Sequence, residues 1–275
     1  MVTDLIYDVG LHNGADTAYY LYKGFRVVAI DANPVLTAAA ERRFKNEIAE
    51  GRLTVLNIGI AETEGTLSFW VNESNDTQSS FNEERAKRYG PCHEILVPCI
   101  SLSTIMAQHG VPYYMKVDIE GYDYLCIQAL NSKDLPKYIS VEQEKDHDLV
   151  ADLRQLGYTK FKIVNQLTYT DSTPIADAES GFRLLRKASS KFPAVHRLLR
   201  RPSVASRLKK LDFDSFADRF AYTFGEGSSG PFGEETWGEW HSADDIRGRI
   251  SDLRHKLATW RIPAGSYWFD IHATD

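Results

Sequence analysis

The sequence predicts an α/β protein built on a doubly wound parallel sheet, and two observations support this. Short apolar runs rich in Val, Ile, Tyr and Phe recur through the first 165 residues and are separated by segments of helical length. Strands that alternate with helices are typical of parallel sheets covered by helices on both faces. Runs such as Val27–Ile30 are apolar without interruption, as in strands that are buried on both sides.

The expected elements follow in order along the chain. Strands are predicted at Leu5–Val9, Arg26–Ile30, Leu53–Ile60, Tyr113–Asp118, Tyr138–Glu142 and Lys160–Val164. Helices are predicted at Ala15–Lys23, at Pro34–Glu50, which begins with a proline as first helical turns often do, and at Lys145–Leu156, which ends at Gly157. The alternation breaks after residue 60, where Thr66–Val71 and Glu94–Ile100 predict short strands, Asn72–Asn82 a polar loop and Leu102–Gln108 a short helix.

About a hundred residues without this rhythm separate the sixth strand from the last strand-like run, Tyr267–His272. That is longer than an ordinary connection. We therefore predict a core over residues 1–165, a mostly helical insertion or lid over 166–262 and a final strand within 263–275 that returns to the core sheet. A helical segment is expected around Asp244–Thr259.

The charge is unevenly distributed. The chain has a net charge of −6, yet residues 181–211 contain ten Lys and Arg and no Asp or Glu. An acidic chain without a recognisable RNA-binding module does not favour a nucleic-acid partner. We interpret the basic stretch first as a helical surface whose charges are solvated or paired with the acidic body. The alternative is a surface that faces an anionic membrane or acceptor.

Cysteine usage and the N-terminus bear on the compartment. Cys92, Cys99 and Cys126 form no C-x-x-C pair, which disfavours a disulfide framework or a zinc ribbon and favours a reducing cytoplasm. The start of the chain lacks a basic segment followed by a long apolar one, and no run approaches 18 apolar residues. We expect a cytoplasmic protein, with peripheral membrane contact as an alternative.

A glycine-rich turn and an acid on the next strand point to a nucleoside-bearing cofactor. The first strand runs into Asp8-Val9-Gly10-Leu11-His12-Asn13-Gly14, and Asp31 ends the second strand 21 residues after Gly10. Such a turn lets a ligand approach the backbone, and the acid can accept hydrogen bonds from ribose hydroxyls. The G-x-x-x-G spacing lacks the second glycine of the dinucleotide motif, and Asp8 suits a cationic amino-acid group better than a pyrophosphate. The pattern favours S-adenosylmethionine over NAD.

Four short motifs at strand ends carry a family resemblance: Asp8–Gly14, Ala29–Pro34, Lys116–Gly121 and Ser140–Glu142. Over about residues 5–165 they resemble the FkbM family of S-adenosylmethionine-dependent methyltransferases. The resemblance implies a class I methyltransferase fold, a Rossmann-like seven-stranded sheet whose last strand is antiparallel. It also implies that residues 1–165 hold the cofactor and that a methyl group passes to a hydroxyl, often of a sugar, glycolipid or natural product.

Acids at strand ends are the candidate catalytic groups, because ligands of doubly wound sheets bind there. Asp118 and Glu120 lie two residues apart, so they share a face with Lys116 on a continuing strand. We expect Asp118 near the methionine end of the cofactor, and Glu120 or Glu142 to act as general base or to orient the acceptor hydroxyl. The predicted catalytic residues are Lys116, Asp118, Glu120, Glu142 and His147, of which His147, like His12, is an alternative base. The predicted cofactor-binding residues are Asp8, Gly10, His12, Asn13, Gly14, Thr17, Asp31, Ala32, Asn33, Ile60 and Asp118.

Several candidates also have purely structural interpretations. Glu120 can cap the helix that begins near Gly121, and Glu142 can form a salt bridge with Lys116. No metal is assigned, and magnesium held by oxygen ligands of the fourth and fifth strands is a weaker alternative. Asp76–Phe81 either closes over the site or lies in solvent. Five aromatic residues are interpreted as packed core rather than a sugar-binding platform: Tyr222, Phe224, Phe232, Trp237 and Trp240.

The sequence as a whole favours an S-adenosylmethionine-dependent O-methyltransferase that acts on a small-molecule, sugar or glycolipid hydroxyl. An NAD(P)-dependent oxidoreductase and a non-catalytic nucleotide-binding scaffold are the alternatives. The acceptor and the oligomeric state are not specified by the sequence.

Overall fold

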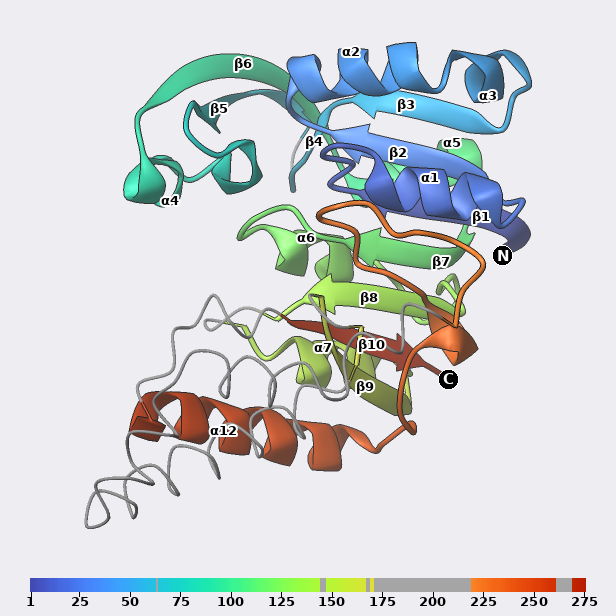
Figure 1. Cartoon of the computed structure of the whole chain (residues 1–275), viewed down its shortest axis with the longest axis vertical. Coiled ribbons are helices and arrows are strands. Elements are labelled where there is room, and N and C mark those ends of the chain that lie inside the picture. Colours follow the sequence, from blue (N-terminus) through green and yellow to red (C-terminus); the bar gives the residue numbers. More distant parts are fainter. Residues whose placement is uncertain (63, 144–146, 167–168, 171–218, 261–268) are drawn as a thin grey trace, which may run out of the picture.

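The computed structural model describes residues 1–62, 64–143, 147–166, 169–170, 219–260 and 269–275. At its centre lies a seven-stranded sheet in the order β3-β2-β1-β7-β8-β10-β9. Its strands are β1 (Val2–Val9), β2 (Arg26–Asp31), β3 (Leu53–Asn57), β7 (Pro112–Val117), β8 (Tyr138–Glu142), β9 (Lys160–Asn165) and β10 (Phe269–Thr274). The last strand, β10, is antiparallel to both of its neighbours, as Figure 1 shows. The prediction of a seven-stranded sheet with an antiparallel last strand is confirmed.

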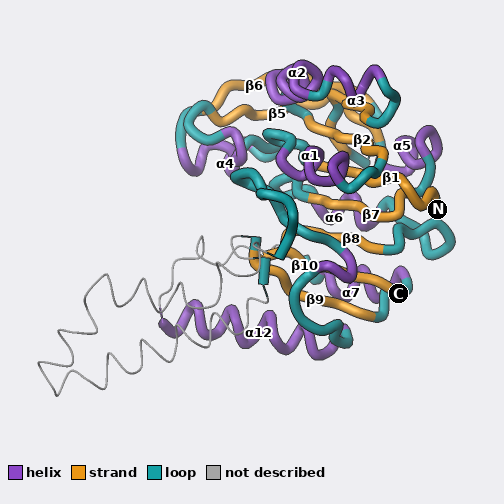
Figure 2. The backbone as a smooth tube through the Cα atoms, turned by 45° about the vertical axis from the view of Figure 1, so that its right-hand side comes forward, coloured by secondary structure: helices purple, strands orange, loops and turns teal. Residues whose placement is uncertain are grey.

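Helices cover both faces of the sheet (Figure 2). One face carries α1 (Ala15–Tyr22), α2 (Pro34–Arg43) and α3 (Lys45–Ala49), and the other carries α5 (Leu102–His109), α6 (Asp123–Gln128), α7 (Leu149–Leu156) and α12 (Ala243–Trp260). Neighbouring residues of β1 show the division, because side chains alternate along a strand. Ile6 packs with Tyr20 of α1, whereas Tyr7 packs with Ile105 of α5. Two apolar layers therefore hold the central strands in place.

The prediction of one strand over Leu53–Ile60 is wrong. The chain leaves the main sheet after β3, and β4 (Gly59–Ile60) joins a second sheet of order β4-β6-β5 with β5 (Gly65–Asn72) and β6 (Cys92–Ile100). Gly59 lies at this change of direction and leaves room for the ring of Phe81, since a Cβ atom there would lie 2.3 Å from that ring. The β5–β6 hairpin projects beyond the ends of the main strands (Figure 1), where it can form one wall of a ligand site.

Two predicted helices are shorter than expected, and one short helix was not predicted. Pro34–Glu50 is divided between α2 and α3 at Phe44, whose ring is buried against Gly14. The helix predicted from Lys145 begins only at Leu149, where Asp148 accepts a hydrogen bond from the amide of Ala151. The polar loop after β5 contains a 3₁₀ turn, and the short helix α4 (Glu83–Ala86) was not predicted, whereas the helix expected to begin near Gly121 is α6, which begins at Asp123.

Most of the predicted insertion lies outside the described residues, including the basic stretch 181–211. The boundaries at 165 and 262 and the role of that stretch therefore stay predictions. In the described part, α12 packs on α7 and β9, and Arg247 pairs with Asp148 at 2.7 Å. The three cysteines are free. Among the described residues, no helix is long and apolar enough to cross a bilayer.

Candidate active site

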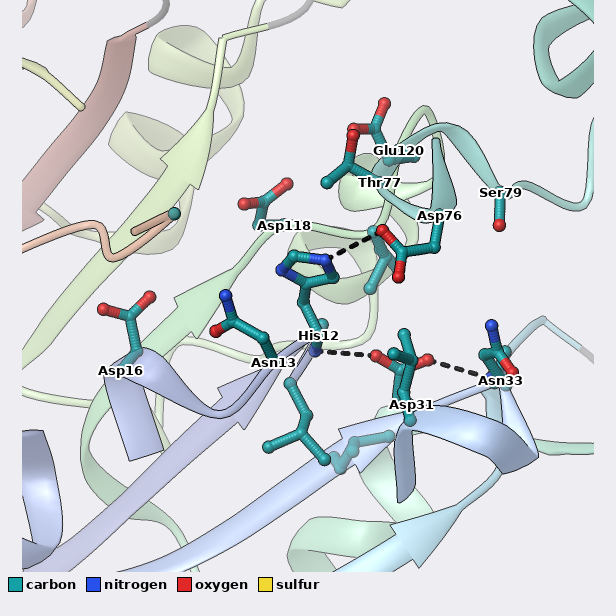
Figure 3. A pocket seen from close by; sticks show the side chains of 18 of the residues that line it. His12, Asn13, Asp16, Asp31, Asn33, Asp76, Thr77, Ser79, Asp118 and Glu120 are labelled. Carbon is teal, nitrogen blue, oxygen red and sulfur yellow. Dashed lines mark hydrogen bonds and ion pairs between the residues drawn. The ribbon is translucent and has the colours of Figure 1, made fainter. Parts of the chain in front are cut away.

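A cavity of about 580 Å³ opens at the carboxyl ends of β1, β2 and β7, within the size range of small-molecule sites. The turns that follow these strands form its floor. Residues 75–81 of the loop after β5 form a second wall, and Glu226 and Gly227 complete the lining from the far end of the chain. Figure 3 shows side chains from these segments converging on the cavity.

Most of the predicted cofactor residues line this cavity. They are Gly10, His12, Asn13, Asp31, Ala32, Asn33, Ile60 and Asp118, whereas Asp8, Gly14 and Thr17 lie behind its surface. Of the predicted catalytic residues, Lys116, Asp118 and Glu120 are part of the lining, and Glu142 and His147 are not. His147 instead stacks on Tyr124 with ring centroids 4.1 Å apart.

Gly10 allows the turn after β1 to touch the end of β7. Its φ is +90°, and a Cβ atom there would lie 1.9 Å from the carbonyl oxygen of Asp118. A side chain would therefore meet both an unfavourable backbone conformation and a backbone atom that cannot move aside. The glycine serves the close packing of two strand ends that form the cavity floor.

Gly10→Ala should lower the free energy of unfolding by about 3 kcal/mol or more, because the strained conformation and the overlap both oppose the methyl group. Gly24→Ala is the matched control, since Gly24 has a φ of +89° with nothing within 4 Å of an added Cβ. It should cost about 1–2 kcal/mol. Urea denaturation measures both variants, and equal losses would refute the close approach at Gly10.

Asp31 organises two of the turns around the cavity. Its Oδ2 accepts a hydrogen bond from the amide of His12 and its Oδ1 one from the amide of Asn33, both at 2.8 Å. Burial raises the pKa of Asp31, and these two amide hydrogen bonds oppose that shift. Each carboxylate oxygen can accept a further hydrogen bond, so the residue can hold the turns and still bind a ligand hydroxyl.

A buried lysine among three carboxylates lies beneath the cavity. Lys116 Nζ is 3.7 Å from Asp8, 3.5 Å from Asp16 and 3.6 Å from Asp118, and it donates to the carbonyl oxygen of Gly10 at 3.1 Å. Thr17 donates to the second oxygen of Asp8 at 2.6 Å. Lys116 therefore holds three acids from three segments, while its charge balances only one of them.

The pKa values of this group reflect burial and mutual charge. Burial opposes the charge of Lys116, but the carboxylates outweigh it, so the pKa of this lysine is raised well above its ordinary value. Burial raises the pKa of Asp8 to about 6, although the lysine charge opposes the shift. The cluster is thus an acid-rich environment suited to an additional cation.

A second group of acids lies at the ends of β7 and β8. One carboxylate oxygen from each of Asp118, Glu120 and Glu142 lies within 4.8 Å of the other two. Glu120 has a φ of +52°, and Arg85 donates to its carboxylate at 2.7 Å. Burial, followed by the charges of Asp118 and Glu120, raises the pKa of Glu142 well above its ordinary value.

Both structural interpretations of these acids are wrong. The turn before α6 is stabilised by Asp123, which accepts hydrogen bonds from the amides of Ile119 and Gly121 at 3.2 and 3.3 Å, and not by Glu120. Lys116 pairs with the acids of the first cluster rather than with Glu142. The sequence alone does not indicate which of the possible partners Lys116 and Glu120 contact, because these partners come from different elements.

The loop that precedes α4 closes one side of the cavity. His12 Nε2 lies 3.1 Å from Asp76 Oδ1 (Figure 3). Ser80 donates to the carbonyl oxygen of Glu120 at 2.9 Å. Of the two interpretations of Asp76–Phe81, the geometry supports the loop that closes over the site.

Sequence reasoning missed a clamp between the first helix and the segment near residue 228. Asp16 Oδ1 accepts hydrogen bonds from Ser228 Oγ at 2.6 Å and from the amide of Ser229 at 2.9 Å. Asn13 Nδ2 donates to the carbonyl oxygen of Glu226 at 2.8 Å. The only sequence feature that marked this segment was the Gly-rich composition of residues 225–233, and composition does not indicate which residues the segment contacts.

The aromatic residues near this segment pack as core. Phe232 is buried and stacks on Tyr114 with ring centroids 4.3 Å apart. Phe224 packs on Tyr19 at 4.9 Å, and Tyr222 and Trp240 pack against the same apolar cluster. Trp237 differs, because it is exposed and lies beside the guanidinium of Arg219.

A comparison with protein-family models decides the family. The model described as the methyltransferase FkbM domain matches residues 8–166, which contain all four motifs of the sequence. The chain belongs to the FkbM methyltransferase family. The matched segment includes the turn after β1, Asp31 and the two acid clusters, so this FkbM-family chain carries most of its candidate site within the family domain, and Glu226 and Gly227 add to the lining from outside it.

Solved structures similar to this FkbM-family protein include three from distant proteins. Precorrin-6y C5,15-methyltransferase from Geobacter metallireducens GS-15 is 14% identical, with a TM-score of 0.34 and coverage of 60% of this chain and 70% of that one. The StiE O-MT (residues 942–1257) is 9% identical, with a TM-score of 0.38 and coverage of 99% and 68%. The cyclase SpnF is 11% identical, with a TM-score of 0.35 and coverage of 99% and 75%. A search of curated proteins finds no match.

Proposed function

We propose that the protein is an S-adenosylmethionine-dependent O-methyltransferase whose acceptor is a hydroxyl of a sugar, glycolipid or other small natural product. One observation carries the proposal. Three carboxylates surround a single buried lysine beneath the cavity, and such a site suits a cationic sulfonium and ammonium group. The same excess of negative charge disfavours the pyrophosphate of NAD(P).

The lining residues at the two ends of the cavity suit different parts of the cofactor. Asp31 faces the ribose, because it lines the cavity at the end of β2 and its oxygens can accept further hydrogen bonds. Ile60 and Ala32 also line the cavity and suit the adenine ring. Asp118 lies at the acid-rich end with Lys116, where the methionine portion belongs.

Glu120 is our choice for the group that takes the acceptor proton. It lines the cavity beside Asp118, whereas Glu142 and His147 do not. Arg85 and Gln78 hold its carboxylate at 2.7 and 3.4 Å. When bound, S-adenosylmethionine supplies an electrophilic methyl group, and the chain aligns the acceptor oxygen with it and receives the hydroxyl proton.

Label transfer from tritiated S-adenosylmethionine tests the reaction. The full-length protein is incubated with a panel of polyhydroxylated acceptors and a matched panel of amines and carboxylates. We expect label in products that resist alkaline hydrolysis, as methyl ethers do and methyl esters do not. Label confined to amines or to alkali-labile esters would contradict hydroxyl methylation.

A further inference from the structure

We propose that Asp118, Glu120 and Glu142 form a binding site for one divalent cation, Mg²⁺ or Mn²⁺, at the edge of the cofactor cavity. The three acids come from the ends of two neighbouring parallel strands. Each offers one carboxylate oxygen, and these oxygens lie within 4.8 Å of one another. Hard divalent cations prefer carboxylate oxygen and leave further positions to water or substrate.

The spacing fits such an ion with small side-chain rotations. Oxygens bound to Mg²⁺ at about 2.1 Å lie up to about 4.2 Å apart when they are opposite one another. The side chains of Asp118 and Glu120 line the cavity, whereas Glu142 ends β8 and is not part of the lining. The arrangement leaves the cavity side open for another ligand.

A second observation points to a ligand between these acids. Glu142 Oε2 is shielded from solvent and has no hydrogen-bond partner among the described residues. A buried carboxylate oxygen without a donor is costly, and a cation between the three acids would satisfy it. The oxygen belongs to the carboxylate that faces Asp118 and Glu120.

The surrounding charges leave room for a cation. Lys116 is shared among Asp8, Asp16 and Asp118, and Arg85 contacts Glu120. Asp270 of β10 is 2% exposed and lies directly opposite Glu142 in the strand register. Within the described part of the chain, these carboxylates outnumber Lys116 and Arg85, the cationic side chains placed against them.

The chemical role of the ion rests on the proposed function, whereas the site itself does not. A cation at these oxygens can also bind the acceptor oxygen, because two of its ligands line the cavity. It would favour release of the hydroxyl proton. As the new O–C bond forms, the S–C bond of the cofactor breaks and its electron pair stays on sulfur, while the proton leaves through Glu120 to water.

Mn²⁺ binding to the metal-stripped, full-length protein tests the site without any cofactor. The electron paramagnetic resonance signal of free Mn²⁺ reports the bound fraction. We expect one Mn²⁺ per chain with a dissociation constant below 1 mM, and at least tenfold weaker binding by Glu142→Gln and by Asp118→Asn. The matched control is Glu73→Gln, an exposed acid on the hairpin, which should bind as the parent protein does.

Absence of saturable Mn²⁺ binding, or equal binding by Glu142→Gln and Glu73→Gln, would overturn the proposal. Circular dichroism identifies a variant that fails to fold. If either Glu142→Gln or Asp118→Asn does not fold, Mn²⁺ binding by the other of these two variants tests the site. Calorimetry with S-adenosylhomocysteine on the same preparation keeps the two proposals apart. Mn²⁺ binding without cofactor binding would refute the proposed function alone, and the reverse would refute the cation site alone.

Discussion

Lys116→Met should lower the free energy of unfolding at pH 8 by about 3–5 kcal/mol, the usual cost of removing one partner from a buried ionic group. Lys116 is 4% exposed, and its Nζ lies within 4.0 Å of Asp8, Asp16 and Asp118. Methionine fills similar volume but leaves these carboxylates without a counter-charge. Urea denaturation measures the loss.

The loss should shrink as the pH is lowered from 8 towards 5. Burial already raises the pKa of Asp8 to about 6, against 3.8 for the unperturbed group. Without the lysine charge this pKa rises further. A carboxyl whose pKa is higher in the folded than in the unfolded state destabilises the fold above its folded pKa, and protonation relieves that cost. A loss that grows on acidification would contradict the assignment.

Lys162→Met is the matched control for Lys116→Met. Lys162 is also 4% exposed, but its Nζ donates to the backbone and side chain of Thr236 and lies over Trp240 at 4.3 Å. Its removal leaves an uncompensated carbonyl and hydroxyl rather than buried carboxylates, for which about 1–3 kcal/mol is expected. If Lys116→Met costs no more than this control, the acid cluster does not depend on the lysine.

Glu120→Gln should reduce the rate of methyl transfer roughly 100- to 10,000-fold, the range of general-base contributions. Gln keeps the size and backbone of Glu120 but cannot take the acceptor proton. The affinity for S-adenosylhomocysteine should change less than threefold, because Glu120 is assigned to the acceptor and not to the cofactor. Tritium transfer gives the rate, and calorimetry gives the affinity.

Two further variants serve as controls for the loss of rate expected in Glu120→Gln. Glu73→Gln removes an exposed acid far along the hairpin and should keep the parent rate. His147→Ala tests the alternative base, which stacks on Tyr124 outside the cavity lining. A large rate loss in His147→Ala with little effect in Glu120→Gln would reverse the assignment.

The fold follows closely from local sequence signals. Mainly apolar runs form the buried strands β1, β2, β7 and β8, and the isolated run at the end of the chain forms the antiparallel β10. The two breaks that were missed, at Gly59 and at Phe44, lie where these residues closely contact Phe81 and Gly14. Such contacts are tertiary, and hydrophobic periodicity does not report them.

The site was predictable where it is formed by consecutive residues. The turn from Gly10 to Asn13 and Asp31 with Asn33 were found by spacing, and all of them line the cavity. The partners of Lys116, Glu120 and Asp16 were not found. These pairs join segments up to 213 residues apart. The sequence offers several oppositely charged or polar partners for each group, and only the tertiary structure shows which of them is in contact.

The most direct test of the account is calorimetric titration of the full-length protein with S-adenosylmethionine, S-adenosylhomocysteine and NAD under the same conditions. The acid-rich cavity with a carboxylate facing the ribose predicts saturable binding of both sulfur-containing cofactors and none of NAD. Saturable binding of NAD without binding of either sulfur-containing cofactor would contradict the account.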